Sequence, residues 1–453
     1  MKKITWVAAI ALTAFTTAGV AQVSVQEAEK LKTTLTPMGG ERAGNGSDIP
    51  PWRGGLSLPP PGFNQSGEHH IDPFPQDKPL FTITASNLKQ YEQFLSEGQK
   101  ALFRTYPDTF TMPIYRTRRT AAAPEWVYEN TYKNAIRAEL AQGGNGIQYA
   151  FGGVAFPIPK NGLEAIWNHI TRWRGVYLVQ GSTEVAVQTN GDFTPITVER
   201  DVEFNYYRQD KGIDGLNNTL YYYISTTKAP ARLAGGAILL QEPVNQVQQP
   251  RQAWGYSAGQ RRVRLAPNLA YDTPIAAADG LRYADDTDMY NGSPDRYSWK
   301  LLGKRELYIP YNNYRLSAGD VKYKDILQAG HLNPKYTRYE KHRVWVVEAT
   351  LKPSMRHAYS KRVFYLDEDT WGIAVADQYD AADKIWRVSM AYIKTYYDAP
   401  ATWSAMEVFH DLQVKRYHVQ GMTNEETGTV NYSHTPPGDR YFTPAELRRR
   451  GKR

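Results

Sequence analysis

Four short runs of acidic residues and histidine have the residue types for catalysis or metal binding. Imidazole and carboxylate groups bind metal ions, and paired carboxylates supply an acid and a base. The runs are His69-His70-Ile71-Asp72, Asp285-Asp286-Thr287-Asp288, Asp367-Glu368-Asp369 and His410-Asp411. The first run has no further ligand at a metal-binding spacing, and the second lacks the glycine and terminal glutamate of an EF-hand calcium loop. We therefore predict a surface polar cluster for the first and a solvated loop for the second.

The other two runs have simpler structural explanations. Asp367-Glu368-Asp369 separates two β-rich segments, and aspartate forms turns through its own side-chain hydrogen bonds. His410 and Asp411 are neighbours in a predicted strand, so their side chains point to opposite faces, and no serine completes a triad by spacing. The chain has no cysteine, no Gly-x-Ser-x-Gly motif and no phosphate-binding glycine loop. The sequence predicts no catalytic residue, metal site or cofactor.

Aromatic residues are abundant, with 32 Tyr and 11 Trp among 453 residues. Several alternate along predicted strands, which places them on one face. For a single residue, core packing is the commoner role, but the set is typical of a dry concave surface that binds an acyl chain. The candidate ligand-binding residues are Trp345, Phe364, Trp371 and Trp386, with Tyr221 and Tyr223 on an earlier strand.

Arginines recur in the same strands, at Arg343, Arg362 and Arg387. Arginine binds carboxylate and phosphate through paired hydrogen bonds, so these three are candidates to hold an anionic head group at the rim of a cavity. The alternative is that they are ordinary surface arginines whose stems lie along the sheet.

The elements that must position these residues are mostly strands. Residues 176–189 and 194–208 flank Asn190-Gly191, a pair typical of a hairpin turn. The apolar spacing of residues 163–173 predicts an amphipathic helix, which we place on the concave side of the sheet because the apolar face must be covered. Further strands are predicted at residues 220–226, 252–256, 261–265, 297–311, 343–351, 361–366, 371–379, 385–396 and 406–419.

The region before this helix has a different composition. Capping boxes at Ser24 and Ser96 predict short helices, the first ending near Lys32. Residues 36–79 are rich in proline, glycine and polar residues and predict an extended arm. The predicted fold class is α+β, mainly β, with a curved antiparallel half-barrel wrapped around a helix. The predicted divisions are a signal peptide at 1–21, an arm and helical region at 22–160, a β domain at 161–420 and a tail at 421–453.

The first 21 residues have the layout of a secretory signal peptide. Lys2 and Lys3 precede an apolar run that ends in the small residues Gly19 and Ala21. The run is shorter than the roughly 20 residues that a membrane-spanning helix needs. We expect cleavage after Ala21 and a mature periplasmic protein, which has no cysteine for a disulfide or a lipidated thiol.

The net charge of +8 is concentrated at the two ends of the chain. Two of the positive charges leave with the signal peptide and five lie in residues 448–453, so the body carries a net charge of +1. A nearly neutral body argues against binding of nucleic acid. The basic tail predicts a solvated end, the alternative being a contact with anionic lipid or a partner.

Four stretches of the chain resemble domain-of-unknown-function family 1329. They are residues 80–85 (LFTITA), 156–162 (FPIPKNG), 167–172 (WNHITR) and 261–267 (RRVRLAP). The family is related to the outer-membrane lipoprotein-sorting carriers, so the resemblance implies a LolA/LolB-like half-open β-barrel around helices with an apolar cavity. Residues 36–161 have no counterpart in those small carriers. As partners, the resemblance implies a resistance-nodulation-division type inner-membrane exporter and an outer-membrane β-barrel protein.

We therefore predict a periplasmic carrier or adaptor that binds a hydrophobic, lipid-like molecule in an apolar cavity, for transport between the inner and outer membranes. It would work by binding and release, without covalent chemistry. Two alternatives stay open. One is a periplasmic hydrolase of lipid or envelope polysaccharide, and the other is a structural adaptor that docks an envelope transporter through its arm.

Overall fold

The computed structural model describes residues 23–266, 269 and 271–451, so the predicted signal peptide at 1–21 lies outside the described residues. The helices are α1 (Val25–Ala28), α2 (Glu97–Thr105), α3 (Glu125–Arg137), α4 (Gly162–Thr171), α5 (Tyr323–Ile326) and α6 (Pro444–Gly451). The strands are β1 (Phe81–Ile83), β2 (Met112–Ile114), β3 (Glu139–Leu140), β4 (Ile147–Gln148), β5 (Tyr177–Val187), β6 (Ile196–Glu203), β7 (Thr219–Ala229), β8 (Ala237–Pro243), β9 (Gln252–Ser257), β10 (Arg262–Leu265), β11 (Tyr297–Pro310), β12 (Tyr339–Leu351), β13 (Lys361–Asp367), β14 (Ile373–Tyr379), β15 (Ile385–Tyr396), β16 (Ala401–Asp411), β17 (Arg416–Met422) and β18 (Val430–Asn431).

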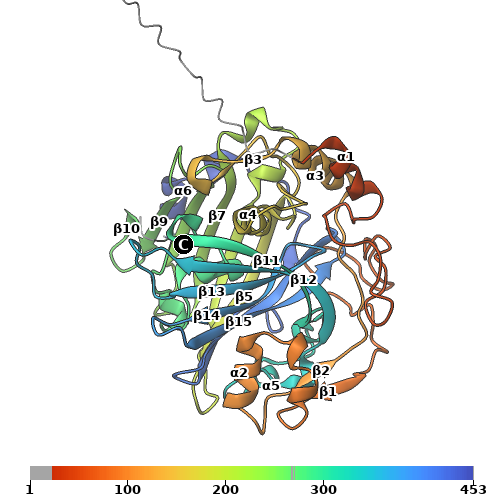
Figure 1. Cartoon of the computed structure of the whole chain (residues 1–453). Coiled ribbons are helices and arrows are strands. Elements are labelled where there is room, and N and C mark those ends of the chain that lie inside the picture. The colour runs from red at the N-terminus through yellow and green to blue at the C-terminus, as the bar shows by residue number, and fades with distance from the viewer. Residues whose placement is uncertain (1–22, 267–268, 270, 452–453) are drawn as a thin grey trace, which may run out of the picture.

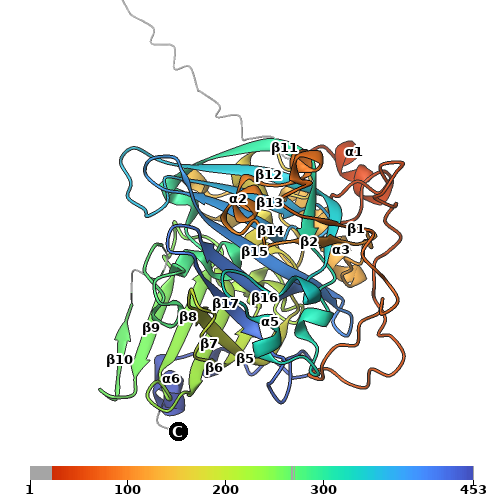
Figure 2. The same ribbon diagram turned by 90° about the horizontal axis from the view of Figure 1, so that it is seen from below.

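Sixteen of these strands form one open sheet. Its order is β1-β2-β12-β13-β14-β15-β16-β17-β5-β6-β7-β8-β9-β10, with β11 also paired to β12 and β18 to β5. The pairing is antiparallel except where β2 meets β12. The sheet twists strongly, so that β11–β15 and β5–β10 run in different directions (Figures 1 and 2). The predicted fold, a mainly β architecture with a curved antiparallel sheet, is confirmed, and the sheet does not close into a barrel.

Most predicted strands are present, but some strands were not predicted and one predicted strand is in fact two. Strand β8 (Ala237–Pro243) was not predicted, because the glycine pair before it and the proline at its end favour a loop. The single strand predicted at 406–419 is a hairpin of β16 and β17. Asp411 makes this turn by accepting hydrogen bonds from the backbone N–H groups of Gln413 and Val414, at 3.1 and 3.2 Å.

Helix α4 is the central helix that the sequence predicts, and it packs on β11 and β12 (Figure 1). Asn161 caps it by accepting a hydrogen bond from the backbone of Glu164 at 2.9 Å. Trp167 is fully buried and donates its indole N–H to the carbonyl of Gly144 at 2.9 Å. The polar side of the helix is buried too, which the amphipathic pattern did not predict. Asn168, for example, exchanges two hydrogen bonds with the backbone of Phe156.

The arm at residues 36–79 has no helix or strand, as predicted, and runs along one side of the molecule (Figures 1 and 2). Side-chain hydrogen bonds hold the arm against the rest of the protein at several points. Trp52 donates to the carbonyl of Ala121 at 3.0 Å, and His70 lies 2.8 Å from the carboxylate of Asp398. The capping box at Ser96 is confirmed at the start of α2.

The basic tail is not simply a solvated end. Its residues 448–451 belong to α6, which packs on β7, β8, β9 and β10, with Leu447 fully buried and Arg450 paired with Asp201. Phe442, just before α6, stacks on Tyr222 of β7. Within the described residues, no helix is both long and apolar enough to cross a membrane.

Candidate ligand-binding cavity

A cavity of about 940 Å³ lies on one face of the sheet, against β5–β9, β16 and β17, and is covered by the segment from 274 to 291. This volume is at the upper end of the range for small-molecule sites. Gln188, Arg232 and Ile238 belong to its wall and are exposed, so the cavity opens to solvent on that side.

Strands β6 and β7 contribute every second residue to the wall. On β6 these are Ile196, Val198, Arg200 and Val202, and on β7 they are Tyr221, Tyr223, Ser225 and Thr227. Because successive side chains of a strand point to opposite faces, the residues between them face away. One of these, Ile224 of β7, belongs to the hydrophobic cluster formed with Phe442 and Leu447 beside α6. The tail therefore covers one face of these strands and the cavity lies on the other.

The polarity of the side chains in the wall changes from one group of neighbouring strands to the next. The residues from β6 to β8 are mainly apolar or aromatic, whereas β5, β16 and β17 supply five of the eight polar side chains that the strands contribute. These five are Ser182, Glu184, Ser404, Glu407 and Gln420. Such a cavity suits an amphiphile rather than a pure hydrocarbon.

A buried ion cluster borders the cavity at Asp288. Arg172 donates to its Oδ1 at 2.5 Å, Arg174 pairs with its Oδ2, and the indole of Trp403 donates to Oδ1 at 2.8 Å. Burial alone would raise the pKa of Asp288, but the two guanidinium groups hold it well below its usual range. The Asp288 carbonyl also lies 2.9 Å from Nε2 of His169 in α4, whose pKa burial lowers to about 3.

Two further carboxyls face the cavity from the polar side. Glu184 lies 3.2 Å from Nε2 of His418 and 3.6 Å from Arg282. Glu407 accepts hydrogen bonds from Ser404, at 2.9 Å, and from Gln420. Burial and the nearby Asp288 carboxylate raise the pKa of Glu407 to about 6.

Of the nine predicted ligand-binding residues, two line this cavity, Tyr221 and Tyr223. The hydroxyl of Tyr221 accepts a hydrogen bond from Asn291 at 2.6 Å. The cavity was expected beside the β12–β15 meander, but it lies against β5–β9. The alternation of apolar residues on β6, at Ile196, Val198 and Val202, was the available signal for this wall.

The four aromatic residues predicted in the meander pack against other parts of the protein, away from this cavity; Phe364 and Trp371 are buried, and Trp345 and Trp386 are partly buried. Trp345 stacks on Trp371, whose indole donates to the carbonyl of Met38 at 2.7 Å. Phe364 is fully buried and stacks on Trp299, and Trp386 donates to Asp411 at 3.0 Å. The arm and α4 cover this part of the sheet, which fills the space that we expected for a ligand.

The three predicted arginines are neither at a rim nor on the surface. Arg362 is fully buried and donates to Asp285 at 2.8 Å, and Arg387 pairs with Asp411 at 3.0 Å. Arg343 donates to the carbonyl of Ala43 in the arm at 3.0 Å. All three are held by internal partners, because segments distant in sequence fold over the meander.

Two of the four acidic and histidine runs also differ from prediction. Asp285, Asp286 and Asp288 are buried in ion clusters rather than in a solvated loop. His70 is buried, not part of a surface cluster, and burial lowers its pKa to about 4. These side chains have partners far away in the chain, which local composition does not reveal.

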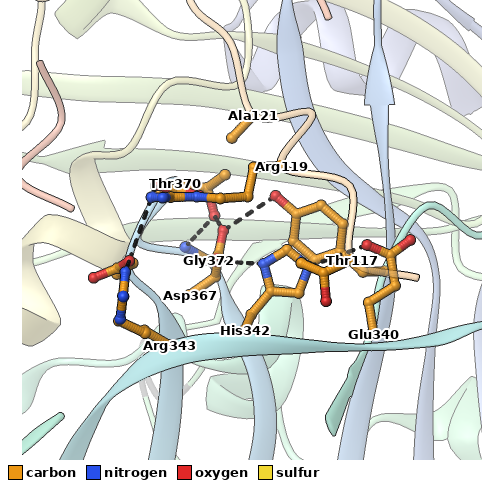
Figure 3. Close-up of polar contacts among 12 residues, drawn as sticks. Thr117, Arg119, Ala121, Glu340, His342, Arg343, Asp367, Thr370 and Gly372 are labelled. Atoms are coloured by element: carbon orange, nitrogen blue, oxygen red, sulfur yellow. Dashed lines mark hydrogen bonds and ion pairs between the residues drawn. The ribbon is translucent and has the colours of Figure 1, made fainter. Parts of the chain in front are cut away.

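The turn predicted at Asp367-Glu368-Asp369 is confirmed, but its side chains are buried. Figure 3 shows the polar contacts around Asp367. Arg119 donates to both carboxylate oxygens of Asp369, at 2.6 and 2.8 Å. Burial and the Asp369 carboxylate raise the pKa of Asp367 to about 7. Possible ligand atoms of His342, Asp367 and Asp369 lie within 4.8 Å of one another, but the Arg119 guanidinium already supplies the positive charge there. We therefore assign this cluster a structural role.

Comparison with known proteins places the chain in a family. The model of the family described as a protein of unknown function, DUF1329, matches residues 82–448. An uncharacterised protein of Pseudomonas aeruginosa, PA3922, is 47% identical over 445 residues, which cover 98% of this chain and 97% of that protein.

Two crystal structures are similar at low sequence identity. One is a DUF1329 family protein from Desulfovibrio piger, with 14% identity, a TM-score of 0.41, and coverage of 60% of this chain and 92% of that chain. The other is a Vibrio parahaemolyticus domain provisionally described as an outer membrane lipoprotein-sorting protein, with 13% identity and a TM-score of 0.42. That match covers 63% of this chain and 98% of that chain.

Proposed function

The chain belongs to the DUF1329 family, and on that premise we propose that it is a periplasmic carrier that binds a hydrophobic, lipid-like molecule in the cavity against β5–β9. The observation that carries the proposal is the cavity itself, about 940 Å³ with a mainly apolar wall on β6–β8. Transfer of an acyl chain from water into such a space yields roughly 0.8 kcal/mol per methylene, which exceeds the cost of confining the chain once enough methylenes are buried.

The cellular setting completes the proposal. Residues 1–21 would direct export and be removed, leaving a mature protein in the periplasm. The carrier would move its ligand between the inner and outer membranes, between a resistance-nodulation-division type exporter and an outer-membrane β-barrel protein. It would act by binding and release, without covalent chemistry.

A chain-length series tests this function. For saturated fatty acids from decanoate to stearate, affinity should rise about fourfold for each methylene that enters the cavity, and level off when it is full. Displacement of a fluorescent fatty-acid probe measures this. Affinity that is the same at every chain length would contradict an acyl-binding cavity.

A pair of variants on β6 ties the binding to this cavity. Val198→Trp places a large side chain in the wall and should abolish probe uptake. Glu199→Trp is the matched control, because the side chain of the next residue points to the other face and pairs with Lys228 at the surface. Both variants should melt cooperatively, and the control should bind like the wild type. Equal uptake by the two variants would place the binding site elsewhere.

A further inference from the structure

At Asp288, one part of the cavity wall has more arginine charge than the paired carboxylate neutralises. Arg172 and Arg174 share a single carboxylate, that of Asp288. Arg174 lines the cavity and is 5% exposed, and its Nε–H has no hydrogen-bond acceptor among the described residues. Burial, together with the positive charge of Arg172, lowers the pKa of Arg174. A second negative charge at this point would complete the cluster.

Arg200 contributes a second incomplete cation from β6. Its Nε and Nη2 both donate to Oε1 of Gln180, the Nε bond being 2.8 Å long, and its guanidinium lies 5.5 Å from the ring centroid of Trp403. Arg200 forms no ion pair with a carboxylate of the described residues, and the nearby carboxylate of Glu184 is paired with His418 and Arg282 instead. Arg251 shows the contrast, since it pairs with Glu242 and also donates to the Leu269 carbonyl at 2.8 Å and to Asn291.

Aromatic rings link the two cations into one patch. Arg174 lies 4.5 Å from the ring centroid of Phe204, and Phe204 contacts Trp403 edge to face at 6.4 Å. Trp403 in turn contacts Arg200 and donates its N–H to Asp288. All these side chains line the cavity beside its apolar wall. We call Arg174, Arg200, Phe204 and Trp403 the arginine patch.

From this geometry we infer that the ligand is an anionic amphiphile, whose carboxylate or phosphate head binds at the arginine patch and whose apolar body lies along β6–β8. The inference rests on the proposed carrier function. A guanidinium presents paired N–H groups that match carboxylate and phosphate oxygens, and such bonds are strong in a site shielded from water. The aromatic rings exclude water from the head group and continue into the apolar wall.

The test keeps one chain and varies the head group. Oleate, 1-oleoyl lysophosphatidate, oleyl alcohol and oleylamine share the same hydrocarbon, and their dissociation constants are measured with the full mature protein. We expect both anions to bind at least about tenfold more tightly than the alcohol. The ratio of lysophosphatidate to oleate then identifies which anionic head the patch prefers.

Two substitutions assign the effect to the patch. Arg200→Gln should reduce the preference for anions over the alcohol to below about threefold while leaving alcohol binding unchanged. Arg262→Gln, at an exposed arginine of β10 that is not part of the cavity wall, is the control and should keep the preference. If Arg200→Gln does not fold, the wild-type head-group ranking still decides the inference.

The outcomes separate the two proposals. Equal binding of all four probes, or tightest binding of oleylamine, which would point to the Glu407 carboxyl instead, overturns the anionic head group and leaves the carrier function standing. If no probe binds, the carrier function itself fails.

Discussion

Replacing Asp288 with asparagine is expected to lower the free energy of unfolding by about 3–5 kcal/mol, because Arg172 and Arg174 then lose their shared counter-charge inside the protein. Asp288 has a backbone φ of 55°, a conformation that asparagine tolerates. The variant therefore tests the charge and not the backbone. Urea unfolding followed by tryptophan fluorescence measures the change.

Asp279→Asn is the matched control. Asp279 also has a positive φ, of 50°, and its side chain is 64% exposed beside Arg416. A surface ion pair contributes about 0–1 kcal/mol, so this variant should differ little from the wild type. If the two variants lose the same stability, the Asp288 cluster does not hold the fold at the cavity.

Replacing Arg119 with leucine should have a comparable effect, a loss of about 3–5 kcal/mol, since Asp369 is then buried without its guanidinium partner and Glu368 keeps only Lys304 and Arg343. The loss should also depend on pH. The carboxyls of the unfolded chain titrate near pH 4, whereas burial and the Asp369 carboxylate already raise the pKa of Glu368, and the loss of Arg119 raises it further. The folded variant thus binds more protons than the unfolded chain, and its stability falls as pH rises through this window.

The measurement is urea unfolding at about pH 5 and about pH 8, with the larger deficit expected at the higher pH. Asp367, with its pKa of about 7 in the intact cluster, shows the same direction of shift. Arg118→Leu is the control, because Arg118 pairs with Asp77 near the surface and its side chain is 35% exposed. If Arg119→Leu loses no more unfolding free energy than Arg118→Leu, or if its loss does not grow with pH, the role assigned to this ion pair is contradicted.

The strand pattern made the architecture predictable. Alternating side chains and turn residues locate β5 to β7 and the β12–β15 meander, and the apolar spacing locates α4. The errors in the predicted strands have local causes. The hairpin of β16 and β17 turns on Asp411 rather than on glycine or proline, and β8 begins after a glycine pair.

The site was less predictable because its charges pair over long distances in the sequence. Arg172 meets Asp288 116 residues away, and Arg119 meets Asp369 250 residues away. Local composition made Asp285, Asp286 and Asp288 resemble a solvated loop. The large number of aromatic residues likewise could not show which of them pack in the core and which line the cavity, since both roles favour large apolar side chains. Only Tyr221 and Tyr223 of the predicted ligand-binding set line the cavity.

The central claim is that the cavity against β5–β9 carries a hydrophobic ligand, and native mass spectrometry of protein purified from the periplasm of its own host tests it most directly. The account predicts a bound mass that organic extraction recovers as a lipid-like molecule, present on the wild type and on Glu199→Trp and absent from Val198→Trp. A wild-type protein without any extractable apolar ligand, or a Val198→Trp protein that carries the same ligand, would contradict it.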